Sequence, residues 1–260
     1  MLPPLQDKRF HDLATEGFHF ACHPGMACFN QCCRKLELWL TPYDVLCLRR
    51  RLELSSEEFI ERFSEVKAGQ NGWPMPQLLM RADDPERTCP FLGDNGCTVY
   101  EGRPGACRTY PLGRATRGGR DGGPSEEGFF LVREEHCQGF AAGPLWQPPD
   151  WIKDQGLETY NAVNDQFLPI ITRQAPDPSP QVITQKMRMF FMACYDLEAF
   201  RKFVGQIRFA QLFMIPQIRL ELVASNDLEL LRLGFDWLRF AIFGDATMIL
   251  REEAGQGQKI

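Results

Sequence analysis

The sequence predicts a mainly α-helical protein with an irregular, cysteine-rich metal-binding region that contains at most short β-strands. Three observations predict this fold class. Strong helix-start signals appear early in the chain, and the second half repeats apolar residues at helical spacing. The first half also contains eight clustered cysteines, on both sides of these helix signals, among loops rich in proline and glycine. Loops of this kind lack a core of their own, so the cysteines are expected to organise them by binding metal.

Composition places the protein among ordinary globular chains. Its 260 residues are 44% hydrophobic and 24% charged, and a chain of this length buries a core without covalent cross-links. The N-terminus has no apolar stretch typical of a secretory signal, and no window is apolar enough for a membrane span. We therefore expect a cytoplasmic protein, in a reducing compartment where thiols persist and commonly bind metals.

The charge pattern does not indicate a nucleic-acid surface. The net charge is −5, and the only compact basic cluster is Arg49-Arg50-Arg51, which is typical of a solvated helix face. No nucleic acid is expected as a partner. Another protein could bind, and the sequence leaves the oligomeric state open.

A proline-rich connection from Ala141 to Pro149 suggests where the chain divides. All the clustered cysteines precede it. We expect a cysteine-cluster metal-binding domain over residues 1–143 and an α-helical domain over residues 144–260.

In the first part, Thr41 and Pro42 have the residue types of a helix cap and a first helical position, so a helix is predicted from Pro42 through Leu52. Ser55 and Glu58 fit a capping box that opens a second helix. Residues 69–99 are predicted to be irregular, with at most short strands.

Residues 113–128 are predicted to form a flexible surface loop that leads into a strand over Phe129–Val132. The second part shows helical periodicity throughout. Its predicted helices are 151–171, 182–195, 197–213, 218–224 and 226–243.

The cysteines carry the functional signal. They occur as Cys22-x5-Cys28-x3-Cys32-Cys33, then as Cys89-x7-Cys97-x9-Cys107, and finally as Cys137. Thiolates bind zinc and iron strongly, and four of them complete a tetrahedral zinc site or one iron–sulfur cluster. These eight cysteines are the candidate metal ligands. Cys47 and Cys194 lie in apolar helical surroundings and are interpreted as small buried hydrophobes.

The number of sites stays open at this point. Adjacent Cys32 and Cys33 tend to point in different directions, so they could serve different ions or bridge a larger site. Eight cysteines could fill two four-thiolate sites, and four ligands with four bystanders fit equally well.

The metal is also open. No pair of CxxC knuckles indicates a zinc ribbon, and the bacterial ferredoxin run is absent. Arginines and a lysine beside the cysteines would stabilise thiolates. These basic residues are Arg34, Lys35, Arg103 and Arg108. An iron–sulfur cluster, with the 4Fe–4S type first, is therefore favoured over zinc. No P-loop or strand-linked GxGxxG accompanies the cysteines.

The same residues resemble the bacterial YkgJ family of cysteine-cluster proteins, described as zinc- or iron-chelating. The resemblance rests on Phe20-x-Cys22, Cys32-Cys33, Cys89-Pro90-Phe91-Leu92 and the run from Cys97 through Arg103-Pro104 and Cys107-Arg108 to Tyr110-Pro111. It covers roughly residues 18–140. Some relatives are named flagellin lysine N-methylase, with an iron–sulfur cluster implicated in the methyl transfer.

Three hypotheses follow. The first is a cytoplasmic protein that carries a cysteine-ligated iron–sulfur cluster. The second, implied by the resemblance alone, is a cluster-dependent protein-lysine N-methyltransferase, which would also require S-adenosylmethionine. The third is a non-catalytic, zinc-stabilised interaction module. No catalytic or cofactor-binding residue is identified from the sequence.

Overall fold

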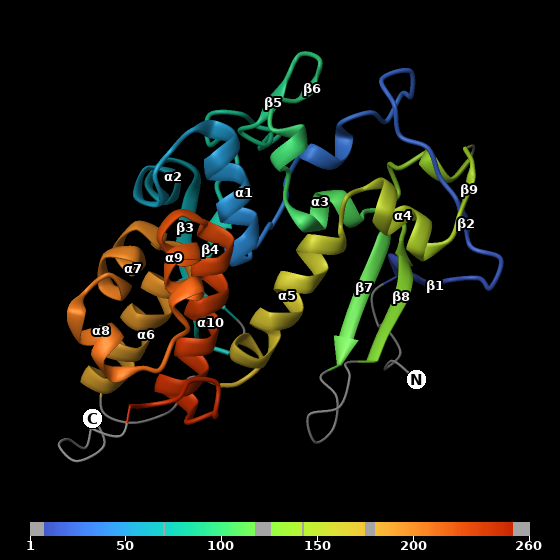
Figure 1. Cartoon of the computed structure of the whole chain (residues 1–260). Helices are drawn as coiled ribbons and strands as arrows, with labels where there is room; N and C mark the ends of the chain where they lie inside the picture. Colours follow the sequence, from blue (N-terminus) through green and yellow to red (C-terminus); the bar gives the residue numbers. More distant parts are fainter. Residues whose placement is uncertain (1–7, 70, 118–125, 142, 175–179, 252–260) are drawn as a thin grey trace. The chain divides into compact units, whose positions relative to one another are not determined.

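The computed structural model describes residues 8–69, 71–117, 126–141, 143–174 and 180–251. In these ranges the chain is mainly helical, with ten α-helices and short antiparallel strands (Figure 1). This confirms the predicted mainly α class and the helical second part. None of the helices in these ranges combines the length and the apolar character that a bilayer-crossing segment needs.

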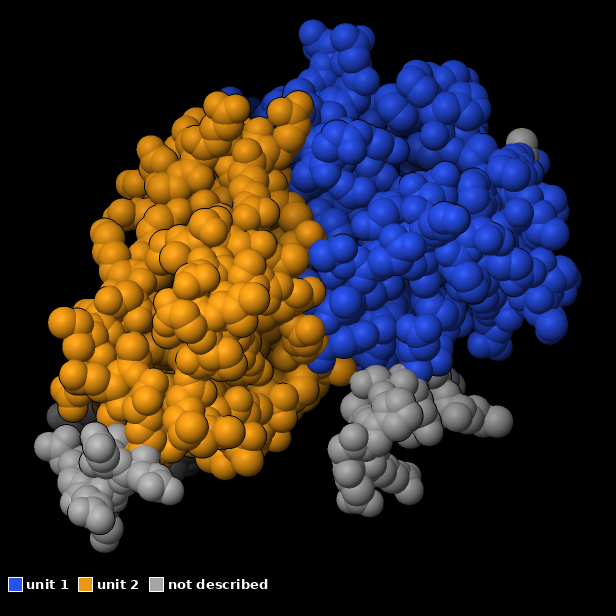
Figure 2. Space-filling model, viewed as in Figure 1, with its two compact units in different colours: residues 1–38, 78–165 blue, residues 39–77, 166–260 orange. Residues whose placement is uncertain are grey.

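The chain forms two compact units, each built from two separate segments (Figure 2). Unit 1 comprises residues 1–38 and 78–165, and unit 2 comprises residues 39–77 and 166–260. A compact unit need not be an independently folding domain, so the division into 1–143 and 144–260 stays a prediction.

Unit 2 begins with the two helices that local signals predict. Helix α1, Pro42–Leu52, is capped by Thr41, and α2, Ser56–Phe63, is capped by Ser55. Both caps form complete capping boxes, in which the cap side chain and the acidic residue three positions later satisfy each other's backbone amides. Both helix predictions are confirmed.

A hairpin of β3, Ser64–Ala68, and β4, Pro74–Leu78, follows these helices. At its turn, Trp73 is fully buried and stacks on Phe190 with ring centroids 4.7 Å apart. The indole N–H donates to the carbonyl of Arg173 at 2.8 Å. Trp73 therefore anchors the hairpin to the helices of the unit with both its apolar and its polar parts.

The remaining helices supply most of the core of unit 2. They are the end of α5 (Glu158–Ile171), α6 (Pro180–Tyr195), α7 (Leu197–Val204), α8 (Ile207–Leu212), α9 (Gln217–Ser225) and α10 (Asp227–Phe243). The prediction of one helix over 197–213 is wrong, because the chain breaks at Gly205 between α7 and α8. Glycine is a poor residue for a helix interior and here follows the last residue of α7.

Helices α6 and α10 approach closely at Gly234. A Cβ atom at this position would lie 2.8 Å from the carbonyl oxygen of Ala193, so the contact requires glycine. Next to it, Phe200 of α7 packs against Trp237 with ring centroids 5.5 Å apart. This aromatic and aliphatic interior stabilises unit 2.

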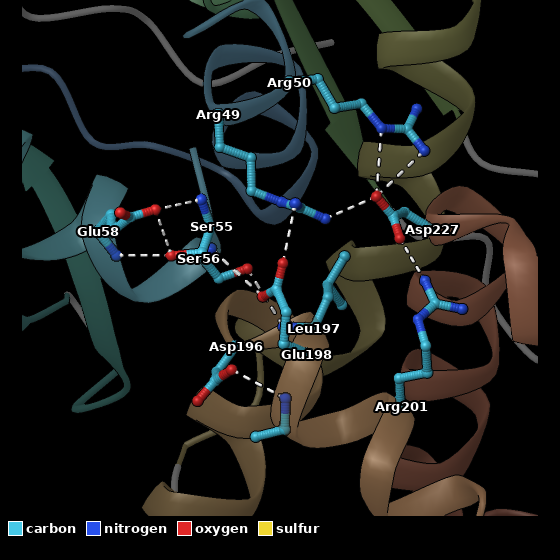
Figure 3. Close-up of polar contacts among 11 residues, drawn as sticks. Arg49, Arg50, Ser55, Ser56, Glu58, Asp196, Leu197, Glu198, Arg201 and Asp227 are labelled. Atoms are coloured by element: carbon cyan, nitrogen blue, oxygen red, sulfur yellow. Dashed lines mark hydrogen bonds and ion pairs between the residues drawn. The ribbon is translucent and has the colours of Figure 1, made fainter. Parts of the chain in front are cut away.

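A polar network crosses the same unit (Figure 3). The guanidinium of Arg49 on α1 donates to Glu198 on α7 at 3.0 Å and to Asp227 on α10 at 2.6 Å. The Arg49 side chain is only 8% exposed. Interpreting the Arg49–Arg51 run as a solvated face is therefore wrong for Arg49, because acidic residues distant in sequence satisfy it inside the fold.

Unit 1 contains a three-stranded antiparallel sheet of order β1-β8-β7. Its strands are β1 (Phe10–Asp12), β8 (Glu126–Val132) and β7 (Leu112–Arg117). The strand predicted at Phe129–Val132 is confirmed and begins earlier. The loop predicted over 113–128 is wrong for residues 113–117 and 126–128, which pair as strands; residues 118–125 lie outside the described ranges.

Residues 113–117 form a strand because they contact residues distant in sequence. Arg114 on β7 forms ion pairs with Glu127 at 2.9 Å and with Asp165 on α5 at 2.8 Å. At Gly113, a Cβ atom would lie 2.3 Å from the ring of Phe130, so the missing side chain makes room for that ring. In the sequence alone, these glycine and arginine residues suggest a loop. In the fold, their contacts with neighbouring segments stabilise a strand.

The core of unit 1 is an aromatic cluster around Phe20. This residue follows β2 (Phe18–His19), which pairs with β9 (Leu145–Trp146). The ring of Phe20 packs edge-on against Phe140 at 5.3 Å and Trp151 of α4 (Pro148–Asp154) at 5.7 Å. The indole of Trp146 donates to the Phe20 carbonyl at 3.0 Å. Phe20 therefore fixes the backbone two residues before the first clustered cysteine.

Candidate metal centre

All eight predicted ligands lie in unit 1, on three chain segments. These segments are residues 22–33, residues 89–107 and the turn at Cys137. Every cysteine is a free thiol, and the eight range from the buried Cys28 to the exposed Cys22, Cys32 and Cys107. The two excluded cysteines, Cys47 and Cys194, belong to unit 2. Cys194 is fully buried, as expected for a small hydrophobe, whereas Cys47 is only half-buried.

The first segment is a succession of tight turns. The amide of Met26 donates to His23, that of Gln31 to Cys28, and that of Cys33 to Asn30, each at 3.0–3.1 Å. The segment ends in the short 3-10 helix η1, Gln31–Cys33. Repeated reversal of the backbone folds the four cysteines of this loop back on one another.

A backbone ladder joins this loop to the second segment. The amide of Cys89 donates to the carbonyl of Cys33 at 2.8 Å. Arg34 and Thr88 form a β-bridge beside this bond, and Lys35 bonds to Arg87 one step further. Two cysteines far apart in sequence are thereby held on directly bonded backbone.

The second segment folds into the hairpin of β5 (Leu92–Gly93) and β6 (Gly96–Cys97). Leu92 pairs with Cys97, and Thr98 donates from both its amide and its hydroxyl to the Phe91 carbonyl at 2.9 Å. The turn at Gly96 has φ +114°, a conformation that favours glycine. The hairpin returns Cys97 to the neighbourhood of Cys89.

Backbone amides point at several of these sulfurs. Burial raises the pKa of Cys89, while the N–H groups of Phe91 and Leu92 oppose that shift. Burial likewise raises the pKa of Cys97, opposed by the N–H of Val99. Hydrogen bonds from backbone amides to sulfur stabilise a thiolate and are typical of cysteines that bind metal.

The third segment reaches the first through sulfur. Cys137 lies in a turn in which its amide donates to the carbonyl of Glu134 at 2.9 Å. The next amide, that of Gln138, donates to the sulfur of Cys28 at 3.3 Å. This contact brings Cys137 beside the buried cysteine of the loop.

Four thiols form what we name the Cys22 group: Cys22, Cys28, Cys32 and Cys137. Burial is the main cause that raises the pKa of Cys22 to about 11, and the thiolates of the other three raise it further. Charges interact this strongly only at short range, so the four thiols occupy one neighbourhood.

The other four thiols form the Cys89 group: Cys33, Cys89, Cys97 and Cys107. A hydrogen bond with Cys32 is the main cause that raises the pKa of Cys33, followed by burial and by the thiolates of Cys32, Cys89 and Cys107. Cys97 in turn acts on Cys89, and Cys32 of the other group acts on Cys97. The hydrogen bond with Cys33 lowers the pKa of Cys32 to about 7. The two groups therefore meet at Cys32, which acts on both Cys33 and Cys97.

Within the described ranges, no three His, Cys, Asp or Glu side chains form a group that could hold a metal ion.

Arg103 is the basic residue that faces the cysteines. It is buried, its guanidinium lies 3.7 Å above the ring of Tyr100, and it donates to the Tyr100 carbonyl at 3.1 Å. Its charge opposes the upward pKa shifts of Cys22 and Cys97, although burial remains the larger effect. Arg103 therefore supports the thiolates of both groups.

The other predicted basic residues act differently. Arg108 donates to the carbonyls of Arg103 at 3.2 Å and Gln155 at 2.8 Å, so it fixes backbone near α3, Gly105–Thr109. Lys35 pairs with Glu86 at the surface, at 3.6 Å. Of the four basic residues predicted to support thiolates, Arg103 is the one whose charge acts on the cysteine pKa values described above.

Tyr110 is a site residue that the search for ligands missed. Burial raises the pKa of its hydroxyl, and the neighbouring Cys137 thiolate adds to the shift. The hydroxyl is buried beside Cys137 without a geometrically complete hydrogen bond. Its sequence signal is its place in the run from Cys107-Arg108 to Tyr110-Pro111, which contributes to the family resemblance.

Eight thiols gathered from three segments of one compact unit define a cysteine-rich metal-binding protein. Residues 21–138 match the family model described as “CxxCxxCC: Putative zinc- or iron-chelating domain”, so this part of the chain is similar to the cysteine-cluster family that its sequence resembles. No curated protein and no solved structure matches the chain.

Proposed function

We propose that unit 1 binds iron–sulfur clusters through the Cys22 group and the Cys89 group. The observation that carries this proposal is that three segments of unit 1 bring eight free thiols together, with the Cys89 amide bonded to the Cys33 carbonyl and the Gln138 amide bonded to the Cys28 sulfur. In a 4Fe–4S cluster each of four thiolates binds a different iron.

The surroundings of the thiols support the same proposal. Backbone amides point at the sulfurs of Cys28, Cys89 and Cys97, and the buried cation Arg103 adds positive charge. Four thiolates on one cluster form an anionic site, and hydrogen bonds to sulfur together with a buried cation stabilise it.

Each group supplies four thiolates, enough for one cluster. Because Cys32 and Cys33 are adjacent, two clusters would share this point of the backbone. When bound, a cluster supplies one-electron redox chemistry. The protein's own contribution is to hold three chain segments together and to exclude water from the buried side of the site.

A reducing compartment suits this proposal, so we infer that the protein is cytoplasmic. Methyl transfer to protein lysines rests on the resemblance to flagellin lysine N-methylases alone. A non-catalytic zinc module is the chief rival, because four thiolates also satisfy zinc.

The test is anaerobic purification of the full chain, followed by an absorption spectrum and by iron, sulfide and zinc analysis of the same sample. We expect a brown protein with matched iron and sulfide, about eight of each per chain for two 4Fe–4S clusters. A colourless protein with about one or two zinc ions and no sulfide, even after reconstitution, would overturn the proposal and leave the zinc module.

Calorimetry with S-adenosylmethionine then addresses the enzyme hypothesis on the loaded protein. Saturable binding would support it. If a protein with full iron and sulfide content does not bind S-adenosylmethionine, the methyltransferase hypothesis is wrong. The cluster proposal is unaffected by that result.

A further inference from the structure

Exposed apolar side chains gather on one part of unit 2. They lie on α8, on α9, in the connection between these helices and in the segment before Arg251. These side chains are Ile207 (77% exposed), Met214 (56%), Ile218 (71%), Leu222 (46%) and Ile249 (65%). Scattered exposed hydrophobes are normal, whereas a contiguous group indicates a surface that another molecule covers.

The backbone brings two of these residues together. Met214 donates its amide to the carbonyl of Ile249 at 2.8 Å, which sets these two residues side by side. Ile218 and Leu222 lie one turn apart on α9, so their side chains share a face of the helix. Helix α9 buries only Val223, so most of its surface lacks a partner within the described part of the chain.

An open groove of about 1090 Å³ runs beside these residues. Its apolar lining comes from α7, α8, α9 and α10, and includes Ile207, Leu212, Leu220 and Val223. Among the described residues, its charged lining consists of Arg201, Arg208 and Arg251, with no aspartate or glutamate. The groove is therefore basic in a chain whose net charge is −5.

The three arginines differ in how far they are already satisfied. Arg201 pairs with Asp227 and also donates to the carbonyl of Val223. Arg251 uses its Nε to donate to the Ala210 carbonyl at 3.0 Å. In the described ranges, Arg208 has no hydrogen-bond or ion-pair partner, and it is exposed on α8. Positive charge at the groove thus remains free to bind an anion.

We propose that this groove docks an acidic amphipathic helix of a partner protein. The apolar face of such a helix would cover the apolar lining residues, including the exposed Ile207, while its carboxylates would meet Arg208 and Arg251. Apolar lining from four helices, with arginines beside it, suits the apolar face and the acidic face of an amphipathic helix. This inference is independent of the metal proposed for unit 1.

The probe is a fluorescent peptide about 18 residues long, about five helical turns, with leucines on one face and glutamates on the other. A twin peptide carries lysine at every glutamate position. Fluorescence anisotropy is measured against the full-length, metal-loaded protein at low and high salt. We expect saturable binding of the acidic peptide only, weakening as salt screens the charges.

Two substitutions test the groove itself. Arg208→Glu is expected to weaken binding at least about tenfold, because it reverses a charge at the docking surface. Ile207→Ser, at a groove-lining side chain that is 77% exposed, is expected to weaken binding without unfolding the protein. Arg188→Glu is the matched control, since Arg188 is also an exposed helical arginine but lies on α6 outside the groove. It should bind as the wild type does.

Three results would overturn the proposal. These are equal binding of the acidic and basic peptides, equal effects of Arg208→Glu and Arg188→Glu, and no binding of either peptide. Binding to anionic phospholipid vesicles in preference to the acidic peptide would likewise overturn it, and would assign the surface to a membrane.

Discussion

The amide of Cys89 donates a hydrogen bond to the carbonyl of Cys33, with nitrogen and oxygen 2.8 Å apart. This bond belongs to a short ladder that includes the Arg34–Thr88 bridge. The backbone of two predicted ligands is thus fixed by ordinary β-type pairing. Metal binding in the Cys89 group then requires mainly side-chain movement, which reduces the conformational entropy that binding must overcome.

The division of the thiols into two groups predicts separable losses of metal. Cys22→Ser and Cys33→Ser should each lower the iron and sulfide content to about half, because each removes a ligand from one four-thiolate set. The double variant should lose nearly all of both. Cys47→Ser, in unit 2, is the control and should keep full content. If either single variant loses everything, the eight thiols serve one site.

Arg103 is predicted to govern how firmly the metal is held. Arg103→Ala removes the buried charge near Cys22 and Cys97 and the bond to the Tyr100 carbonyl. Loss of such supporting contacts commonly weakens metal affinity about 10–100-fold. Iron release to an excess chelator, followed by absorbance, measures the effect.

Arg103→Lys separates charge from geometry. It keeps the positive charge but not the planar guanidinium above Tyr100, so release at an intermediate rate is expected. Lys153→Ala, which removes an exposed charge on α4, should release iron at the wild-type rate. Equal rates for Arg103→Ala and Lys153→Ala would contradict a role for Arg103.

The network at Arg49 is predicted to stabilise unit 2. Arg49→Met should lower the free energy of unfolding by about 2–3 kcal/mol. This loss is no larger than the smallest losses found when one partner of a fully buried ion pair is removed. A smaller loss is expected because Glu198 is 43% exposed and Arg201 still pairs with Asp227. Urea unfolding followed by circular dichroism measures the change.

Arg50→Met is the matched control for that experiment. Arg50 also pairs with Asp227, at 3.3 Å, but its side chain is 51% exposed. A change below about 1 kcal/mol is expected, as for other exposed ion pairs. Similar losses for the two variants would show that burial of Arg49 contributes nothing to stability.

The ion pairs of Asp245 are predicted to make the stability of the fold depend on pH in the acid range. Its hydrogen bond with Arg173 is the main cause that lowers its pKa, and Arg239 lowers it further. A carboxylate with a lowered folded-state pKa stabilises the fold above its unfolded pKa of about 3.9, and that stability is lost as pH falls through the lower folded value.

Asp245→Asn should therefore destabilise the protein at neutral pH and make unfolding less sensitive to pH below about 4. Urea midpoints measured across that range test it. If the urea midpoint of the variant changes with pH as steeply as that of the wild type, Asp245 does not contribute to the loss of stability in acid.

Local signals predicted the parts of the fold that depend on a few consecutive residues. Thr41 and Ser55 cap their helices as expected, because a capping box is complete within four positions. Strand β7 was missed because it depends on pairing with β8 and on the bond from Arg114 to Asp165. Nothing within a short window carries that information.

The site shows the same division. All eight predicted ligands lie in unit 1, and their binding of metal stays a prediction. The sequence left open whether Cys32 and Cys33 serve different ions, because the ladder to Cys89 and the contact between Gln138 and Cys28 join segments distant in sequence. Tyr110 was missed for a similar reason, because its burial beside Cys137 is a tertiary property.

The interleaving of the two units sets an order of events during synthesis. Helices α1 and α2 leave the ribosome early, yet Glu198 and Asp227, which bond to Arg49, are made more than a hundred residues later. At a translation rate of about 5–20 residues per second, Glu198 and Asp227 are synthesised roughly 7–35 seconds after Arg49. Unit 1 can close around Cys137 in the meantime, so its metal can be loaded on a nascent chain whose second unit is still incomplete.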